Sequence, residues 1–193
     1  MVDKLQLYRE AHPPLTSTNT KWQLYGTGME YFGKEDRPVT EISPNFGPGN
    51  LLVRHDAEGL CAADVKLIRL GQQHPRIAQD LSKEPVVVGH EVTLTVIGVG
   101  ENLKDKFKPG DRFIVQPDIY KNGIGYGYGF AIDGGLSEYS VIDSRVLDGD
   151  AGCYLLPIRA TTGYAESALT EALAAVTAAY RLTFRTTFKP QGV

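Results

Sequence analysis

Apolar residues occur in short runs separated by clusters of Gly, Pro, Asn and Asp, and this pattern predicts a mainly β fold. The longest such stretch covers residues 86–99, and residues 136–142 alternate between apolar and polar side chains. Strands are expected at residues 21–25, 51–54, 86–99, 112–115, 136–142 and 153–158. Residues 64–70 are expected to form a short helix that ends before Gly71.

Two segments lack a clear strand pattern. Residues 72–84 are predicted to be a polar loop or small helix. Residues 120–130 are rich in Gly and Tyr, and we expect a loop that is too poor in aliphatic residues to join the core. Cys153, in the last predicted strand, is expected to be a core residue.

The pattern changes near residue 164. Residues 165–180 are rich in alanine, with apolar side chains three and four positions apart, which predicts a helix with Ser167 and Thr170 near its start. Residues 189–193 are expected to form a turn that leads into a further strand.

Composition and charge narrow the function classes. The 193 residues suffice for one domain with a sizeable core, and the net charge of −3 gives no reason to expect nucleic acid or an anionic membrane as a partner. No apolar run approaches the roughly 20 residues that span a bilayer, and residues 1–6 do not resemble a signal peptide. The two cysteines lie far apart in the sequence, so we expect no disulfide framework and a cytoplasmic location.

Three residue types that bind catalytic zinc occur in a suggestive order. Cys61 is followed by Asp64, and the tripeptide Gly89-His90-Glu91 follows the apolar run at 86–88. A thiolate, an imidazole and a carboxylate can bind zinc and leave a fourth position open for substrate or water. Each residue also has a simpler interpretation. Cys61 can be a small buried side chain and His90 a core histidine, and Asp64 can be the N-cap of a helix that begins at Val65.

Five short motifs, taken in order, resemble the zinc-containing medium-chain alcohol and polyol dehydrogenases. They are GLCAAD at 59–64, GHE at 89–91, FKPGDR at 107–112, GGLSEY at 134–139 and LTEA at 169–172. The resemblance covers residues 45–185 and implies a GroES-like β-barrel catalytic domain, mainly β with some helix, that ends in a helix toward a Rossmann domain. On this basis, residues 1–180 are the GroES-like domain, and residues 181–193 are a linker or the start of the Rossmann domain, the rest of which is missing.

The resemblance also implies roles for particular residues. Cys61 and His90 correspond to zinc ligands, and Asp64 would accept the other ring N–H of His90. Glu91 can bind the metal directly, or it can stay outside the coordination sphere and exchange with water. Glu171 matches the glutamate ligand of the polyol branch, although an exposed helix charge is an equal alternative. Zinc would then act as a Lewis acid on the substrate hydroxyl, and hydride would pass to NAD(P) in the full-length protein.

The sequence departs from the family pattern at three places. Ala63 occupies the position where the family usually has a Ser or Thr that relays the hydroxyl proton, so a relay would need water or Lys66. Leu94 replaces a frequent glycine. The lobe that often holds a structural zinc corresponds to residues 120–130, which contain no cysteine, so no structural zinc is expected.

The leading hypothesis is therefore a zinc-binding domain of a dehydrogenase that acts on a small alcohol, polyol or sugar-like substrate. We expect the chain alone to be inactive without a cofactor domain, and the full-length protein to be a homo-oligomer. The Gly-rich run at 123–127 is not followed by a helix pattern, so it is not taken as a phosphate-binding turn. Two alternatives stay open: a zinc-free relative of the quinone reductases, and a non-catalytic GroES-like assembly module.

Overall fold

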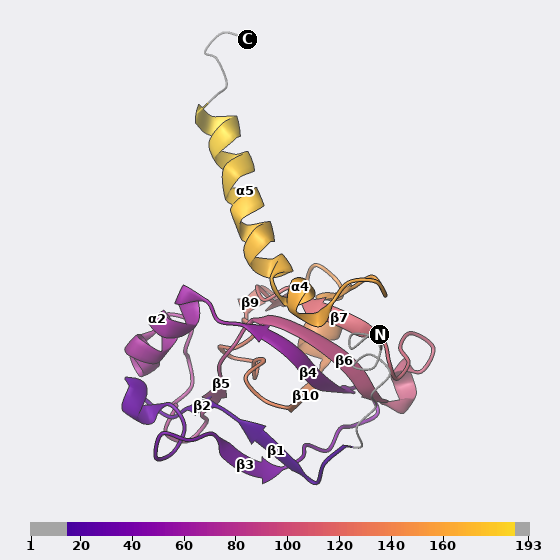
Figure 1. Cartoon of the computed structure of the whole chain (residues 1–193), viewed down its shortest axis with the longest axis horizontal. Helices are drawn as coiled ribbons and strands as arrows, with labels where there is room; N and C mark the ends of the chain where they lie inside the picture. The colour runs from indigo at the N-terminus through magenta and orange to yellow at the C-terminus, as the bar shows by residue number, and fades with distance from the viewer. Residues whose placement is uncertain (1–14, 188–193) are drawn as a thin grey trace, which may run out of the picture.

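The main element of the fold is a five-stranded antiparallel sheet (Figure 1). The computed structural model describes residues 15–187, with side chains up to residue 182. Two strands of nine residues occupy the middle of the sheet and pair along most of their length. In sheet order the strands are β10 (Tyr139–Ile142), β4 (Leu51–Gly59), β6 (Glu91–Val99), β7 (Arg112–Val115) and β11 (Leu155–Pro157).

Smaller sheets complete the β structure. They are the antiparallel pairs β1 (Thr18–Lys21) with β3 (Val39–Ile42), β2 (Gln23–Leu24) with β5 (Val86–Val87), and β8 (Tyr120–Lys121) with β9 (Ile124–Gly125). An isolated bridge between Lys21 and Ser137 links the region of β1 to the segment before β10. Between residues 15 and 187 the hydrogen-bonded strands therefore form separate sheets rather than one closed ring.

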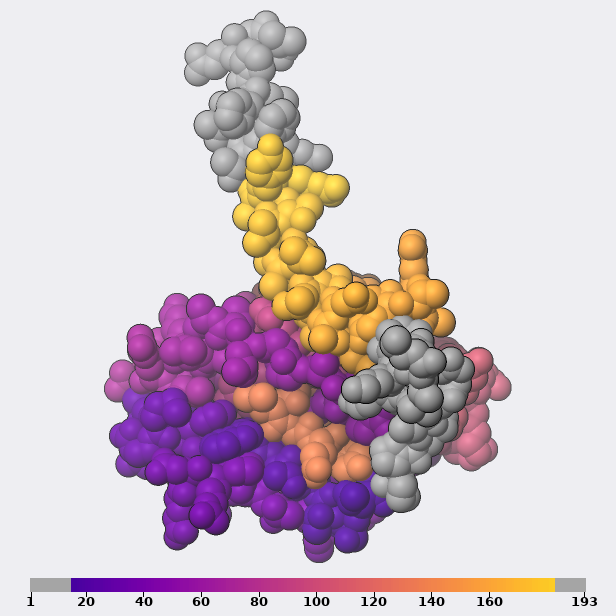
Figure 2. Space-filling view, in the orientation of Figure 1, coloured from indigo at the N-terminus to yellow at the C-terminus, as the bar shows by residue number. Residues whose placement is uncertain are grey.

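The helices lie at the edges of this β structure. The α-helices are α2 (Ala62–Leu70), α3 (Ser144–Leu147), α4 (Tyr164–Ala168) and α5 (Thr170–Thr187), and the short 3-10 helices are η1 (Met29–Tyr31), η2 (Gly71–Gln73) and η3 (Glu101–Leu103). Helix α4 packs against β4 and β6, and α5 runs away from the sheets (Figure 1). The space-filling view in Figure 2 shows α5 standing clear of the rounded body. In the part of the chain that the structure describes, no helix has the length and apolar character needed to cross a membrane.

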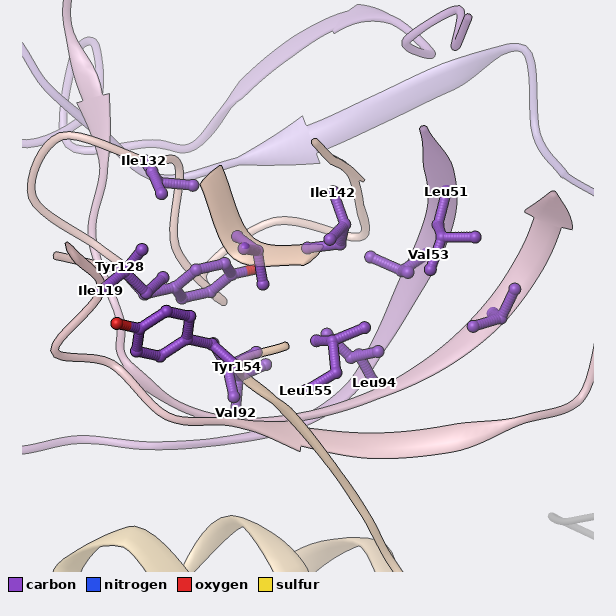
Figure 3. Close-up of a cluster of buried hydrophobic side chains, with 13 residues drawn as sticks. Leu51, Val53, Val92, Leu94, Ile119, Tyr128, Ile132, Ile142, Tyr154 and Leu155 are labelled. Atoms are coloured by element: carbon purple, nitrogen blue, oxygen red, sulfur yellow. The ribbon is translucent and has the colours of Figure 1, made fainter. Parts of the chain in front are cut away.

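Two clusters of buried side chains form the core. The larger lies against the five-stranded sheet, and Figure 3 shows Val53, Leu94 and Ile142 from its strands meeting Tyr128 and Tyr154 from the loops. The smaller joins α2 to β5 through Leu67, Ile68, Val86 and Val88, together with Leu24, Ile77, Leu81 and Phe130. Because Asp64, Leu67 and Ile68 share one face of α2, the packing of this helix also turns Asp64 inward.

Most of the predicted elements are confirmed, with three differences in continuity. The strand predicted at 21–25 is divided at Trp22, which lies between the end of β1 and the start of β2. The helix at 64–70 and the strand at 112–115 form as expected. The predicted strand at 86–99 is divided into β5 and β6 because Gly89 has φ of 106°, a left-handed conformation that a regular strand cannot contain. The helix predicted at 165–180 is divided into α4 and α5, with Leu169 between them. The boundary predicted at residue 180 falls within α5, and the turn predicted at 189–193, like the sequence of residues 1–6, lies outside the described residues.

Two predictions about the core are wrong. The loop at 120–130 does enter the core, because Tyr128 and Phe130 are buried there; aromatic rings supply the apolar surface that aliphatic residues would otherwise provide. Cys153 is exposed rather than buried. It lies between the turn that ends at Gly152 and the start of β11, and the next two residues, Tyr154 and Leu155, occupy the buried positions.

Candidate metal centre

Neighbouring strands bring three potential metal ligands to one end of the sheet. Cys61 is the N-cap residue of α2, two residues after the end of β4. Glu91 is the first residue of β6, and His90 comes directly before it. Because Gly59 pairs with Glu91 in the β4–β6 register, the thiol and the imidazole meet at the same edge. One ligand atom from each of Cys61, His90 and Glu91 lies within 4.8 Å of the other two. The structure therefore brings together the thiol, imidazole and carboxylate that the sequence singled out.

Asp64 fixes the orientation of this group. Its Oδ1 accepts a hydrogen bond from Nδ1 of His90 at 3.0 Å, and its Oδ2 accepts the backbone N–H of Cys61 at 2.9 Å. Asp64 is not the N-cap residue that the sequence suggested, because α2 begins at Ala62 and Cys61 is its N-cap. From the third position of the helix, its carboxylate accepts the N–H of the N-cap residue and also holds the imidazole. With Nδ1 donating to Asp64, Nε2 of His90 keeps its lone pair for a metal or a proton.

The electrostatics of the site favour a bound cation. Burial by itself would lower the pKa of His90, but the hydrogen bond to Asp64 and the negative charges of Asp64, Glu171 and Glu91 raise it. Burial raises the pKa of the Cys61 thiol, and the charges of Glu91 and Asp64 raise it further. A divalent cation at this point would relieve the repulsion between these acidic groups and would favour the thiolate. The donor set therefore fits zinc, for which thiolate, imidazole and carboxylate are usual ligands.

Two other residues singled out from the sequence lie further from this group. Glu171, near the start of α5, is not within the 4.8 Å set, yet its charge acts on His90. Burial raises the pKa of Glu171, His90 opposes this, and Glu91, Asp118 and Asp64 add to the increase. Lys66 is exposed on α2, and its charge acts on His74.

Sequence reasoning missed two residues that surround the site. The Glu58 carboxyl lies next to the backbone of Glu91, whose N–H donates to Oε1 of Glu58 at 3.1 Å. Burial, together with the charges of Asp64 and Glu91, raises the pKa of Glu58 to about 9. The Phe130 ring lies 6.0 Å from the His90 ring and 5.3 Å from the His74 ring, measured between centroids. The sequence offered one signal for Glu58, which is an acidic residue in a predicted β region shortly before Cys61. It offered none for Phe130, which lies in the Gly/Tyr-rich loop.

Comparison with known proteins agrees with this geometry. The family model described as the alcohol dehydrogenase GroES-like domain matches residues 47–148, just over half of the chain. The chain belongs to this family. The matched segment contains Cys61, Asp64, His90 and Glu91, so the residues that converge in the structure lie within the family domain.

Individual relatives share this domain with the chain. It is 34% identical over 145 residues to mannitol-1-phosphate 5-dehydrogenase of Aliivibrio fischeri, an alignment that covers 75% of the chain and 33% of the relative. It is 28% identical over 161 residues to L-sorbose 1-phosphate reductase of Klebsiella pneumoniae, covering 82% and 38%. The crystal structure of 2R,3R-butanediol dehydrogenase from Bacillus subtilis superposes with a TM-score of 0.66 at 23% identity, covering 84% of this chain and 47% of that one.

The family match and the structural likeness confirm the expected GroES-like fold. The chain spans about a third of the length of the curated relatives it matches. The family match at residues 47–148 includes Cys61, Asp64, His90 and Glu91 but ends before Glu171.

Proposed function

We propose that this chain is the zinc-binding catalytic domain of an NAD(P)-dependent dehydrogenase that interconverts a hydroxyl group and a carbonyl group. The observation that carries the proposal is the convergence of Cys61, His90 and Glu91 at the end of β4 and β6. Membership of the alcohol dehydrogenase GroES-like family supports it. The zinc-free and non-catalytic alternatives would give no reason for a thiol, an imidazole and a carboxylate to meet in this way.

We assign a separate role to each residue of the site. Cys61 and His90 would hold the zinc, and Glu91 or Glu171 would supply a carboxylate oxygen. When bound, zinc supplies Lewis acidity that makes a substrate hydroxyl easier to deprotonate. Asp64 keeps Nδ1 of His90 occupied, so that Nε2 would be the nitrogen available to the cation. Because Ala63 offers no hydroxyl, we propose that the substrate proton leaves to solvent through water. Lys66 is exposed on α2, and its ammonium group has no lone pair with which to accept that proton.

The relatives narrow the substrate class. Mannitol 1-phosphate, L-sorbose 1-phosphate and 2R,3R-butanediol, named for three of them, each carry a hydroxyl or carbonyl beside another oxygen-bearing carbon. We therefore propose a small polyol or sugar as substrate. Hydride transfer would require a Rossmann domain and its nicotinamide cofactor in a longer, homo-oligomeric protein. The exposed apolar side chains of α5, including Leu173 and Val176, support the proposal that this helix leads toward such a domain.

The zinc content of the purified chain tests this proposal. We expect about one zinc per chain when the protein is prepared without added metal, measured by plasma mass spectrometry. His90→Ala and Cys61→Ala should remove the metal, because each deletes one ligand of an open site with three protein ligands. Cys153→Ala is the matched control, since this exposed cysteine lies outside the group of converging ligands. A metal-free wild-type chain, or loss of zinc from Cys153→Ala alone, would contradict the proposal.

A further inference from the structure

We propose that Glu58 is a positioning residue for the metal site: its buried carboxyl holds the backbone of His90 and Glu91 so that both side chains face Cys61. The inference rests on the proposed function, because it assigns a role relative to the zinc ligands. Glu58 lies on β4, three residues before Cys61, and β6 begins at Glu91 on the neighbouring strand. One side chain therefore connects the two strands from which all three candidate ligands emerge.

The backbone at this point needs an acceptor from outside the sheet. Gly89, with φ of 106°, turns the chain away from a regular strand just before the two ligands. His90 and Glu91 are both buried, and a buried N–H without an acceptor is strongly unfavourable. The N–H of Glu91 donates to Oε1 of Glu58 at 3.1 Å, and the backbone of His90 lies close enough to this carboxyl to lower its pKa. Glu58 thus supplies the acceptor that a neighbouring strand would provide if the turn at Gly89 did not interrupt the sheet.

Two glycines leave room for this carboxyl. A Cβ atom at Gly89 would lie 2.8 Å from Oε1 of Glu58, and a Cβ atom at Gly135 would overlap Oε2. Gly135 belongs to the GGLSEY motif, whose backbone also bonds to this turn, since the N–H of Gly135 donates to the carbonyl oxygen of Gly89 at 3.0 Å. The space around Glu58 is therefore shaped by the same segments that form the turn before His90.

The carboxyl is an unusual choice for this position. Oε2 of Glu58 is buried and has no hydrogen-bond partner within the described part of the chain. A buried polar atom left in this way destabilises a fold, so an apolar side chain would suit the strand better if packing were the only requirement. Since the other oxygen binds the backbone of a metal ligand, we attribute the carboxyl to the geometry of the site.

Three variants test this role with two measurements. Glu58→Ala removes both acceptor oxygens, Glu58→Gln keeps one, and Asp56→Asn changes another buried carboxyl of β4, held by Arg54 and Thr95. Zinc affinity is measured by competition with a chromophoric chelator. Amide hydrogen exchange of the metal-free chain is measured by NMR at Glu91 and, for comparison, at Val92.

Glu58→Ala should weaken zinc binding about tenfold or more, the usual effect of losing a residue that orients a ligand. It should also speed exchange at Glu91 about tenfold relative to Val92. Glu58→Gln should stay within about threefold of wild type in both measurements, as should Asp56→Asn. If Glu58→Ala does not fold, Glu58→Gln decides: slow exchange at Glu91 supports the role, and fast exchange contradicts it.

Two results would overturn the inference: a folded Glu58→Ala with wild-type affinity and unchanged exchange at Glu91, or an equal loss of affinity in Asp56→Asn. A wild-type chain that binds no zinc would instead overturn the proposed function. The exchange measurement needs no metal, so it separates the two failures.

Discussion

His55 is a partly buried histidine on β4, and its surroundings keep it neutral. Its Nδ1 lies 2.8 Å from the carbonyl oxygen of Ser137 and therefore carries the proton. Its Nε2 then accepts from the hydroxyl of Tyr128 at 3.0 Å or of Ser140 at 3.1 Å. Burial lowers the pKa of His55 to about 4, although the hydrogen bond to Ser137 opposes the change. The Tyr128 pKa is raised, again mainly by burial.

This arrangement predicts acid sensitivity at the residue scale. The unfolded chain protonates His55 near the ordinary value of about 6.5, whereas the folded chain does so only near pH 4. Above the unfolded pKa, His55 is neutral in both states and does not destabilise the fold. As the pH falls, the unfolded chain takes up the proton first, so the free energy of unfolding decreases by about 3 kcal/mol between pH 7.5 and pH 4. Urea unfolding of the wild type and of His55→Gln at both pH values measures it.

The glutamine variant provides the control for that experiment. Gln cannot take up a proton, so His55→Gln should lose about 3 kcal/mol less than the wild type over the same pH interval, while the carboxyl groups titrate alike in both proteins. Equal pH dependence in the two proteins would show that His55 is not held neutral.

Side-chain roles differ in how far the sequence reveals them. Cys61, His90 and Asp64 lie in short motifs whose residue types suggest metal chemistry, and the structure brings them together. Glu58 and Phe130 act through contacts between segments distant in sequence, with Glu91 and with His90 respectively. No local pattern marks such contacts, because they depend on the β4–β6 register and on the path of the loop.

At the scale of elements, the interruption between β5 and β6 comes directly before the candidate ligands His90 and Glu91. Val86, Val87 and Val88 form an unbroken apolar run, so the pattern predicts one strand continuing through residue 99. The break depends on the positive φ of Gly89, a conformation that glycine permits but does not require. By contrast, the helix at 64–70 and the strand at 112–115 are predictable because local periodicity and flanking turn residues agree with the packing.

Replacing Gly89 tests the importance of this break. Gly89→Ala adds strain at φ of 106° and places a Cβ atom 2.8 Å from Oε1 of Glu58. The matched control is Gly110→Ala, at φ of 92° with no atom within 4 Å of the new Cβ. We expect Gly110→Ala to lower the free energy of unfolding by about 1–2 kcal/mol through strain alone. Gly89→Ala should cost at least about 1 kcal/mol more because of crowding.

Chemical denaturation of both variants measures these costs, and zinc affinity should fall only in Gly89→Ala. Equal destabilisation by the two substitutions would mean that the turn at Gly89 adapts without disturbing Glu58. Unchanged zinc affinity in Gly89→Ala would mean that the break does not direct the ligands.

At the scale of the whole molecule, the family architecture is recognisable from five motifs in order, and the fold confirms it. The hydrogen-bonding of the strands is less predictable. Residues 21–25 and 136–142 resemble ordinary strands in sequence, yet Lys21 and Ser137 form only an isolated bridge between sheets. Strand pairing of this kind is set by the long-range fit of segments more than a hundred residues apart, which periodicity does not encode.

The most direct test of the metal centre is X-ray absorption spectroscopy of the zinc-loaded chain. We expect one sulfur at about 2.3 Å, together with nitrogen and oxygen ligands at about 2.0–2.2 Å. The sulfur contribution should disappear in Cys61→Ser and persist in Cys153→Ser. A zinc environment without sulfur, or one whose sulfur survives Cys61→Ser, would contradict a site built from Cys61, His90 and a neighbouring carboxylate.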